Sequence, residues 1–221
     1  MGYTIYSRKR MRQIIAMIAA TWLFWGTPVI YPVNILVTFF HELSHGLGAL
    51  LTGGKVIGIS VQANGAGLCR TQGGWDLVIG SAGYLGSMFW GSLILLLASR
   101  TRYDRAVSVA IGLLLVAVTL LFVRAPFGIV SGLLLGGLFL AVGLRLDESA
   151  NDLALTFTGA SVCLYALYDI RALFVGDYGD AAHLSRDVLP LPPAVWALLW
   201  AAVSAVWFWF TLKLALREEL P

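Results

Sequence analysis

Five consecutive residues of this 221-residue chain, His41-Glu42-Leu43-Ser44-His45, have the HExxH spacing of a metal-binding helix. Residues four apart lie on one face of a helix, so the imidazoles of His41 and His45 can bind one Zn²⁺ at about 2.0–2.1 Å. Glu42 is rotated by about 100° from His41, so its carboxylate can act on a water molecule at the metal without being a ligand. The spacing therefore predicts a zinc site in which Glu42 is the general base.

The motif is a specific signal in this composition. With three histidines and four glutamates in the chain, HExxH is expected by chance in about one such sequence in a thousand, so the risk of a false match is small. The alternative is that these are polar side chains satisfied inside a helix bundle. Each charged group on an apolar membrane helix costs about 2.5–3.5 kcal/mol on insertion scales, and a bound metal offsets that cost. We therefore favour the metal site.

A catalytic zinc site needs a third protein ligand and an open position for water. We favour Asp169, a carboxylate in the apolar stretch CLYALYDIRALF, because an intramembrane carboxylate needs a partner. Its alternative role is a salt bridge with a nearby arginine such as Arg171. Asp180 and His183, in GDYGDAAHL, are the reserve candidates, since that stretch is expected to be hydrated. Asp180 could instead cap a short helix, and His183 could be an ordinary interfacial residue.

The composition places these residues in a membrane protein. Hydrophobic residues make up 59% of the chain and charged residues 12%, against about 45–50% and about 25% in soluble domains. Six stretches lack charged residues and histidine: 13–40, 77–99, 106–123, 125–144, 153–168 and 188–212. Since a spanning helix needs about 17–25 apolar residues, we predict an all-α polytopic protein of the cell membrane, with about six to seven transmembrane helices in one domain, 1–221.

The same composition excludes other classes of protein. Cys69 and Cys163 are far apart and lie in no CxxC or Cys/His cluster, so they indicate neither a disulfide framework nor a thiolate metal site. The net charge of +3 comes from basic residues at the ends of apolar stretches, which is typical of membrane topology signals rather than of nucleic-acid binding. We therefore expect the lipid bilayer, and no nucleic acid, as a partner.

The HExxH motif lies in a predicted helix at about 34–52, which follows a first helix interrupted by Pro28 and Pro32 and ends at Gly53-Gly54. Alternating residues and an Asn64-Gly65 turn then predict a β-hairpin at about 55–73. Further helices are predicted at about 75–99, 106–123, 126–144, 153–174 and 192–214. In the first of these, small residues recur every four positions and favour close helix packing.

The orientation in the membrane stays open at this point. Four basic residues near the N-terminus favour a cytoplasmic start. Seven full spans would then place Arg100, Arg102 and Arg105 outside, against the positive-inside rule. One early segment is therefore expected to be re-entrant or partly inserted, and the hairpin is the main candidate, since irregular backbone at membrane depth must be enclosed by protein or water.

Several stretches make the chain similar to the site-2 protease family of intramembrane zinc metalloproteases, and to its compact bacterial branch without a PDZ domain. They are FHELSHGLGALLTGGKV, the hairpin, SAGYLGS at 81–87, YDIRAL and GDAAHL. The resemblance implies a metal held by His41, His45 and an aspartate from a distant helix. It also implies Glu42 as general base, cleavage of a peptide bond within a transmembrane protein substrate, and a glycine-rich helix, here SAGYLGS, near the active site.

The chain departs from the family pattern at two places. Ser44 stands where most members have glycine, and the segment ending in Leu-Asp-Gly that carries the third ligand is absent as such. Asp169 is its nearest match, with Ile170 in place of the glycine. Such departures are also expected of an inactive homologue that binds transmembrane segments as a scaffold, although the presence of Glu42 counts against this alternative, since a scaffold needs no general base. A metal transporter and a membrane enzyme of other chemistry are further alternatives. The hairpin could pair with an extended substrate or could simply cap the bundle.

Overall fold

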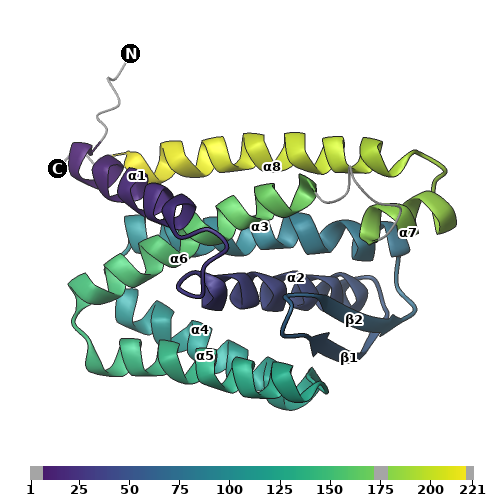
Figure 1. Ribbon diagram of the computed structural model, residues 1–221, viewed down its shortest axis with the longest axis horizontal. Coiled ribbons are helices and arrows are strands. Elements are labelled where there is room, and N and C mark those ends of the chain that lie inside the picture. Colours follow the sequence, from purple (N-terminus) through teal and green to yellow (C-terminus); the bar gives the residue numbers. More distant parts are fainter. Residues whose placement is uncertain (1–6, 172–178, 218–221) are drawn as a thin grey trace.

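The computed structural model describes residues 7–171 and 179–217 as a mostly helical protein with one β-hairpin (Figure 1). The described elements are α1 (Arg8–Leu23), α2 (Tyr31–Leu51), β1 (Lys55–Val61), β2 (Gly67–Gln72), α3 (Asp76–Arg100), α4 (Asp104–Phe122), α5 (Pro126–Arg145), α6 (Glu148–Asp169), α7 (Asp180–Asp187) and α8 (Pro193–Leu216). The prediction of a helical protein with a hairpin after the HExxH helix is confirmed.

Four of these helices, α3, α4, α5 and α8, are long and apolar enough to cross a membrane. They make the chain a multi-pass membrane protein, but four spans in the described part are fewer than the six to seven predicted. The remaining helices fall short for local reasons. With 16 residues, α1 is shorter than a spanning helix needs, α2 carries the polar HExxH residues, and α6 begins with charged and amide side chains.

The first two helices differ from their predicted bounds. The first helix begins at Arg8, before the apolar stretch that starts at residue 13, because the Ser7 side chain caps the backbone N–H of Arg10 at 3.4 Å and the basic residues join the helix. It ends at Leu23, before a turn in which Gly26 has φ 74°. The second helix starts near Pro32, since proline is tolerated in the first turn. It ends as predicted at Gly53, where φ is 84°.

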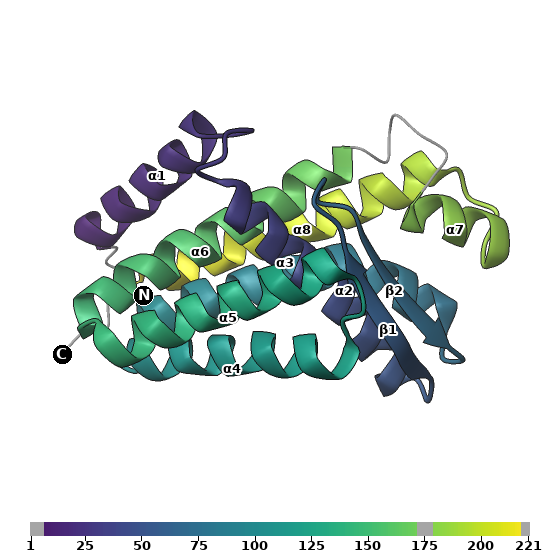
Figure 2. The ribbon, with the colours of Figure 1, turned by 60° about the horizontal axis from the view of Figure 1, so that its bottom comes forward.

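The hairpin is antiparallel, with Lys55 opposite Gln72 and Val61 opposite Gly67, and it lies beside α2 (Figure 2). Its turn is bonded to α2, because the Tyr31 hydroxyl donates to the carbonyl of Ala63 at 2.6 Å and the Thr38 hydroxyl donates to that of Gly65 at 2.9 Å. On the other side, the backbone N–H of Arg124 donates to the carbonyl of Ile59 at 2.9 Å. The β1 edge is therefore covered in part by the α4–α5 connection, and β2 faces α2 and the site.

Small residues allow the helices to approach closely, as the sequence predicts. A Cβ atom on Gly91 of α3 would lie 2.7 Å from Cys163 Sγ on α6. On α5, a Cβ atom on Gly136 would lie 2.7 Å from a methyl carbon of Val116 on α4. Such contacts favour helix association in lipid, where the hydrophobic effect does not. The main buried cluster lies between α2 and the α4–α6 helices, and its fully enclosed members include Phe39, Phe40, Leu115 and Leu155.

The last third of the chain departs from prediction at α6 and α7. The predicted helix from residue 153 begins five residues earlier as α6, because Asp147 caps the N–H of Ala150 at 2.8 Å. The final predicted residues, 172–174, lie outside the described residues. The short helix α7 then begins at Asp180 and buries Ala181 and Leu184 completely. This packing places the start of α7 over α2 and α3.

Candidate metal centre

Near the middle of α2, the side chains of His41, Glu42 and His45 lie close together. One potential ligand atom from each of His41, Glu42 and His45 lies within 4.8 Å of the others. The two imidazole rings are 4.7 Å apart between centroids, and their planes are inclined by 77°. His45 and Glu42 are 6% and 5% exposed, whereas His41 is half-buried. The helical spacing therefore produces the predicted cluster on the inner side of α2.

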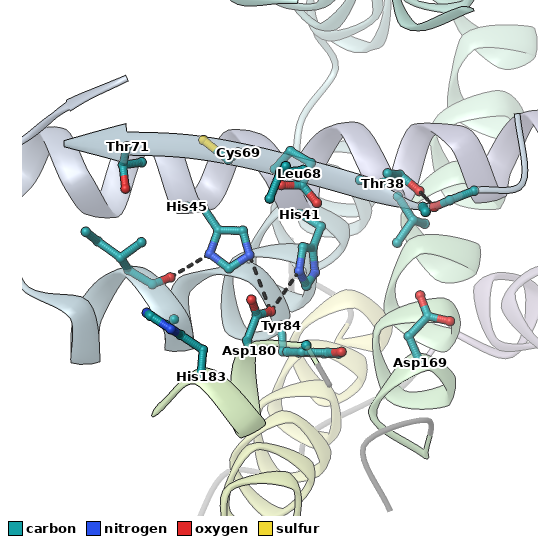
Figure 3. Close-up of a pocket in the computed structure, with 18 of the residues that line it drawn as sticks. Thr38, His41, His45, Leu68, Cys69, Thr71, Tyr84, Asp169, Asp180 and His183 are labelled. Atoms are coloured by element: carbon teal, nitrogen blue, oxygen red, sulfur yellow. Dashed lines mark hydrogen bonds and ion pairs between the residues drawn. The ribbon is translucent and has the colours of Figure 1, made fainter. Parts of the chain in front are cut away.

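Asp180, at the start of α7, reaches both imidazoles from across the cavity (Figure 3). Its Oδ2 atom lies 3.2 Å from Nε2 of His41 and 3.4 Å from Nε2 of His45. Burial raises the pKa of Asp180, but the hydrogen bonds and charges of the two imidazoles outweigh it and hold the pKa well below its usual range. The carboxylate is therefore in its ionised form beside both nitrogen atoms.

These three atoms suit a zinc ion in type and in spacing. Two imidazole nitrogens and one carboxylate oxygen form a donor set that catalytic zinc sites use. In a tetrahedral site with metal–ligand bonds of about 2.0–2.1 Å, neighbouring ligand atoms are about 3.3–3.4 Å apart. The distances of 3.2 and 3.4 Å from Asp180 to the imidazoles match that spacing. His41, His45 and Asp180 are therefore the residues that would hold the metal.

The His45 ring is oriented by the backbone of the next helix. Its Nδ1–H donates to the carbonyl oxygen of Ile79 in α3 at 2.6 Å, which turns Nε2 toward Asp180 and the cavity, where it would supply its lone pair to a bound metal. A ligand histidine commonly donates its other N–H in this way, because the bond selects the tautomer. His41 instead packs edge-on against Tyr84, with ring centroids 4.8 Å apart, and Tyr84 stacks on Trp200 of α8 at 5.2 Å.

The hairpin holds Glu42 from the other side. The backbone N–H of Cys69 in β2 donates a hydrogen bond to the Glu42 carboxylate. Gly67, at the start of β2, lies so close that a Cβ atom there would be 2.7 Å from both Cγ and Cδ of Glu42. Only a residue without a side chain allows this approach. The hairpin is thus part of the site, because its backbone fixes the proposed base.

Two glycines of α3 make room for the motif. A Cβ atom on Gly83 would contact Nε2 of His41 and would lie 2.6 Å from Nε2 of His45. Gly86 lies against Ser44, whose hydroxyl donates to the carbonyl of Phe40 at 2.6 Å within α2. The serine in place of the family's glycine is therefore accommodated and directed away from the imidazole nitrogens. The small residues predicted to mediate packing recur every four positions, whereas the two glycines that face the motif, Gly83 and Gly86, are three apart.

The site opens into a cavity of about 1030 Å³ that β2, α3, α6 and α7 line together with α2. Asp169 and His183 both line it. Within the described residues, Asp169 makes no hydrogen bond or ion pair with either imidazole, and it lies beyond the Tyr84 ring (Figure 3). Its suggested partner Arg171 lies over the Tyr168 ring at 3.5 Å.

The His183 side chain is paired within α7 and does not contact the imidazoles. Its Nδ1 atom pairs with Oδ2 of Asp187 at 2.8 Å, one turn further along the helix, and about half of its side chain is exposed. The structure therefore brings only one of the three candidate third ligands, Asp180, to both imidazoles. Gly67, beside Glu42, is a residue that the sequence did not single out. The Asn64-Gly65 turn is the one signal that placed Gly67 near the start of a strand.

Comparison with known proteins agrees with this geometry. The family model described as Peptidase M50B-like matches residues 14–211, which is most of the chain and includes the motif, the hairpin and α7. No curated protein and no solved structure matches the chain.

Proposed function

Because the chain belongs to the Peptidase M50B-like family, a site-2 protease-like family of metallopeptidases, we propose that it is an intramembrane zinc metalloprotease that cleaves membrane-embedded protein segments. The observation that carries the proposal is the convergence of His41, His45 and Asp180 beside Glu42. This cluster lies in a cavity of a protein with four candidate spanning helices. The substrate class follows from that setting, since the described part of the chain has no separate soluble domain to capture a substrate.

We place Asp180 ahead of Asp169 as the third zinc ligand. Its Oδ2 atom is at tetrahedral ligand spacing from both imidazole nitrogens, whereas Asp169 has no bond to either. This reverses the order favoured from sequence. Asp169 lines the same cavity beyond Tyr84, where its carboxylate adds a polar group to the wall.

The protein's own residues would perform the proton transfers. Zinc, when bound, acts as a Lewis acid toward water and a peptide carbonyl. Glu42 is adjacent to the two ligand histidines and is held by the Cys69 N–H through its carboxylate. That carboxylate takes the proton of the attacking water and delivers it to the nitrogen of the leaving amine. The backbone bond keeps the carboxylate directed at the cavity, so the base need not be positioned during the reaction.

A helical substrate must be unwound before cleavage, because its carbonyls are already bonded within the helix. The outer edge of β2 offers replacement partners, since β1 occupies the other side of β2 and the outer edge lines the cavity from Gly67 to Thr71. An extended peptide added to this edge would gain backbone hydrogen bonds and pass directly over the metal centre. Part of the edge is already used by the Cys69–Glu42 bond, so the peptide would pair beside it.

We further propose that α2 and α6 lie at membrane depth, enclosed by the four apolar helices. Their inner faces are buried: Phe39 and Phe40 of α2 and Leu155 of α6 are at most 1% exposed. This arrangement gives six helices at membrane depth and a cavity whose polar residues are shielded from lipid by protein. The bilayer is then the medium from which substrates approach.

The scaffold alternative loses its main support. Ser44 is directed to its own helix backbone rather than to the metal centre, and Glu42, which a scaffold does not need, is held by the hairpin. The deciding experiment compares the purified parent protein with Glu42→Gln. Each is analysed for zinc and incubated with transmembrane peptides that contain Gly, Pro or Asn near the middle. Zinc in both proteins with cleavage only by the parent supports the protease, whereas zinc without cleavage by either supports the scaffold.

A further inference from the structure

The cavity beside the metal centre is lined by acidic side chains without basic ones. Four carboxylates line it, those of Glu42, Asp76, Asp169 and Asp180. Among the described residues, no lysine or arginine belongs to its wall, and the rest of the sequence contains none. Any positive charge that balances these carboxylates must therefore come from a bound metal or from a substrate.

Three of the four carboxylates are stabilised by other features of the site. A zinc ion would carry two positive charges, which Asp180 as a ligand and Glu42 beside it would balance. Asp76 is exposed in the first turn of α3, where water and the positive end of the helix dipole stabilise it. Asp169 remains as the carboxylate for which the cavity wall provides no opposite charge.

Asp169 is the last residue of α6 and is half-buried. In the described part of the chain, its carboxylate forms no hydrogen bond and no ion pair. The guanidinium carbon of Arg171, two residues further on, lies instead 3.5 Å from the centroid of the Tyr168 ring. A carboxylate partly removed from water costs free energy unless a donor or a positive group pairs with it. A positively charged ligand would remove that cost.

The metal centre lies between two halves of the cavity. Asp169 and Thr38 lie on one side of the two imidazoles, whereas Thr71 and His183 lie on the other (Figure 3). The residues of β2 that line the cavity extend from Gly67 to Thr71 and so pass both halves. A peptide paired with this edge would cross the metal centre from one half to the other. Side chains on one side of its scissile bond would then lie in the half that contains Asp169.

Two amide side chains belong to the same half as Asp169. Asn34 and Asn64 both line the cavity. Asn34 lies one turn before Thr38 in α2, and its side-chain nitrogen would be 3.1 Å from a Cβ atom on Gly65 in the hairpin turn. Amide and carboxylate oxygens are the acceptors that an ammonium or guanidinium group needs. An acidic side chain of a substrate would instead meet a like charge in this half.

We propose that Asp169 is a specificity residue, which binds a lysine or arginine side chain of the substrate close to the scissile bond and disfavours an acidic one there. This inference rests on the proposed function and narrows its substrate class. Lysine and arginine are costly in the middle of a membrane helix, but near its ends their side chains can extend to the interface. The favoured substrates are therefore membrane segments that are cut near an end carrying a basic residue.

The test compares peptides that differ in one charge. A transmembrane peptide with Gly-Pro near one end carries Lys, Gln or Glu in turn at each of the three positions on either side of that dipeptide. Binding of the labelled peptides to zinc-loaded Glu42→Gln protein in detergent is measured by fluorescence anisotropy, and cleavage is measured with the parent protein. For at least one position, the lysine peptide should bind at least tenfold more tightly than the glutamate peptide, because a charge pair partly removed from water is less screened than a surface pair.

Equal binding of the three peptide types at every position, tighter binding of glutamate, or no binding at all would overturn the inference. This comparison needs no change at Asp169, so it does not depend on the folding of a variant there. Cleavage by the parent without a preference for lysine would leave the protease proposal standing and remove this inference. A preference for lysine without cleavage would keep the role of Asp169 and remove the protease.

Variants then assign the preference to one carboxylate. Asp169→Asn, added to the Glu42→Gln protein, should reduce the lysine preference to less than threefold while the zinc content stays unchanged. Asp169→Glu keeps the charge and should keep a preference for lysine. Asp76→Asn is the matched control, because it removes an exposed carboxylate from the wall of the same cavity, and it should leave the preference intact. An undiminished preference in Asp169→Asn would refute the assignment.

Discussion

Gly83→Ala should weaken zinc binding while leaving the fold intact. The added methyl group would lie 2.6 Å from Nε2 of His45 and against Nε2 of His41, whereas ordinary van der Waals contact begins near 3.4 Å. The imidazoles must therefore move by about 0.8 Å, which exceeds the tolerance of about 0.5 Å for a functional constellation. Since the clash is with both proposed ligand nitrogens, its effect should appear in metal affinity before it appears in folding.

The magnitude follows from the cost of overpacking. An extra methyl group in a filled interior costs about 1–3 kcal/mol. In the zinc-free protein the imidazoles can rotate away from the added methyl group and so avoid this cost. Zinc binding must return them to the strained position, so the overpacking energy is subtracted from the free energy of zinc binding. Zinc affinity should then fall by about 5- to 150-fold, since about 1.4 kcal/mol corresponds to tenfold. The unfolding temperature of the zinc-free protein should change little, because alanine gains up to about 1 kcal/mol over glycine in a helix.

The assay is a competition titration of zinc against a chromophoric chelator in detergent, accompanied by thermal unfolding of the zinc-free protein. Gly137→Ala is the matched control, because it is also a helical glycine and a Cβ atom there would contact nothing within 4 Å. The control should keep the parent's zinc affinity. If Gly83→Ala bound zinc as tightly as Gly137→Ala, the placement of Gly83 against the ligand nitrogens would be wrong.

Five further variants separate the roles within the site. His41→Ala should lose zinc, whereas Glu42→Gln should keep zinc and lose turnover at least a hundredfold; equal zinc content in His41→Ala and the parent would contradict the ligand assignment. Asp180→Asn should lower zinc occupancy in elemental analysis while Asp169→Asn leaves it near the parent's, and the opposite order would restore the assignment made from sequence. Gly67→Ala should keep zinc but slow peptide cleavage, because its methyl displaces the carboxylate of Glu42; unchanged turnover would show that the hairpin does not position the base.

The sequence predicts the local features of this site well. HExxH and its helix are read from residues within one turn of each other, and the hairpin from alternation and an Asn-Gly turn. Both depend on interactions between near neighbours in the chain. The same reason explains why the sequence predicts the end of α2 at Gly53 and the apolar helices α3, α4, α5 and α8.

The third contact to the imidazoles was not predictable in this way. From its sequence context, Asp180 belongs to a polar connection between helices. Leu184 of α7 is buried against Gly80 of α3, so closely that a Cβ atom on Gly80 would lie 2.8 Å from it, and this packing brings α7 over the site. That contact joins residues about a hundred positions apart. Apolar content alone also does not reveal that α1 is only 16 residues long, or that the inner faces of α2 and α6 are buried among the other helices.

The bond from His45 to the carbonyl of Ile79 has a consequence for mutational scanning. A main-chain oxygen is present in every amino acid, so no substitution at Ile79 deletes the acceptor, and a scan would score the position as tolerant. Sensitivity should appear instead where the spacing of α2 and α3 is set. Gly48 is such a position, because a Cβ atom there would lie 3.2 Å from the Ala82 methyl and 3.4 Å from the Ile79 Cα. The orientation of a proposed zinc ligand is thus encoded by a glycine one turn away on its own helix.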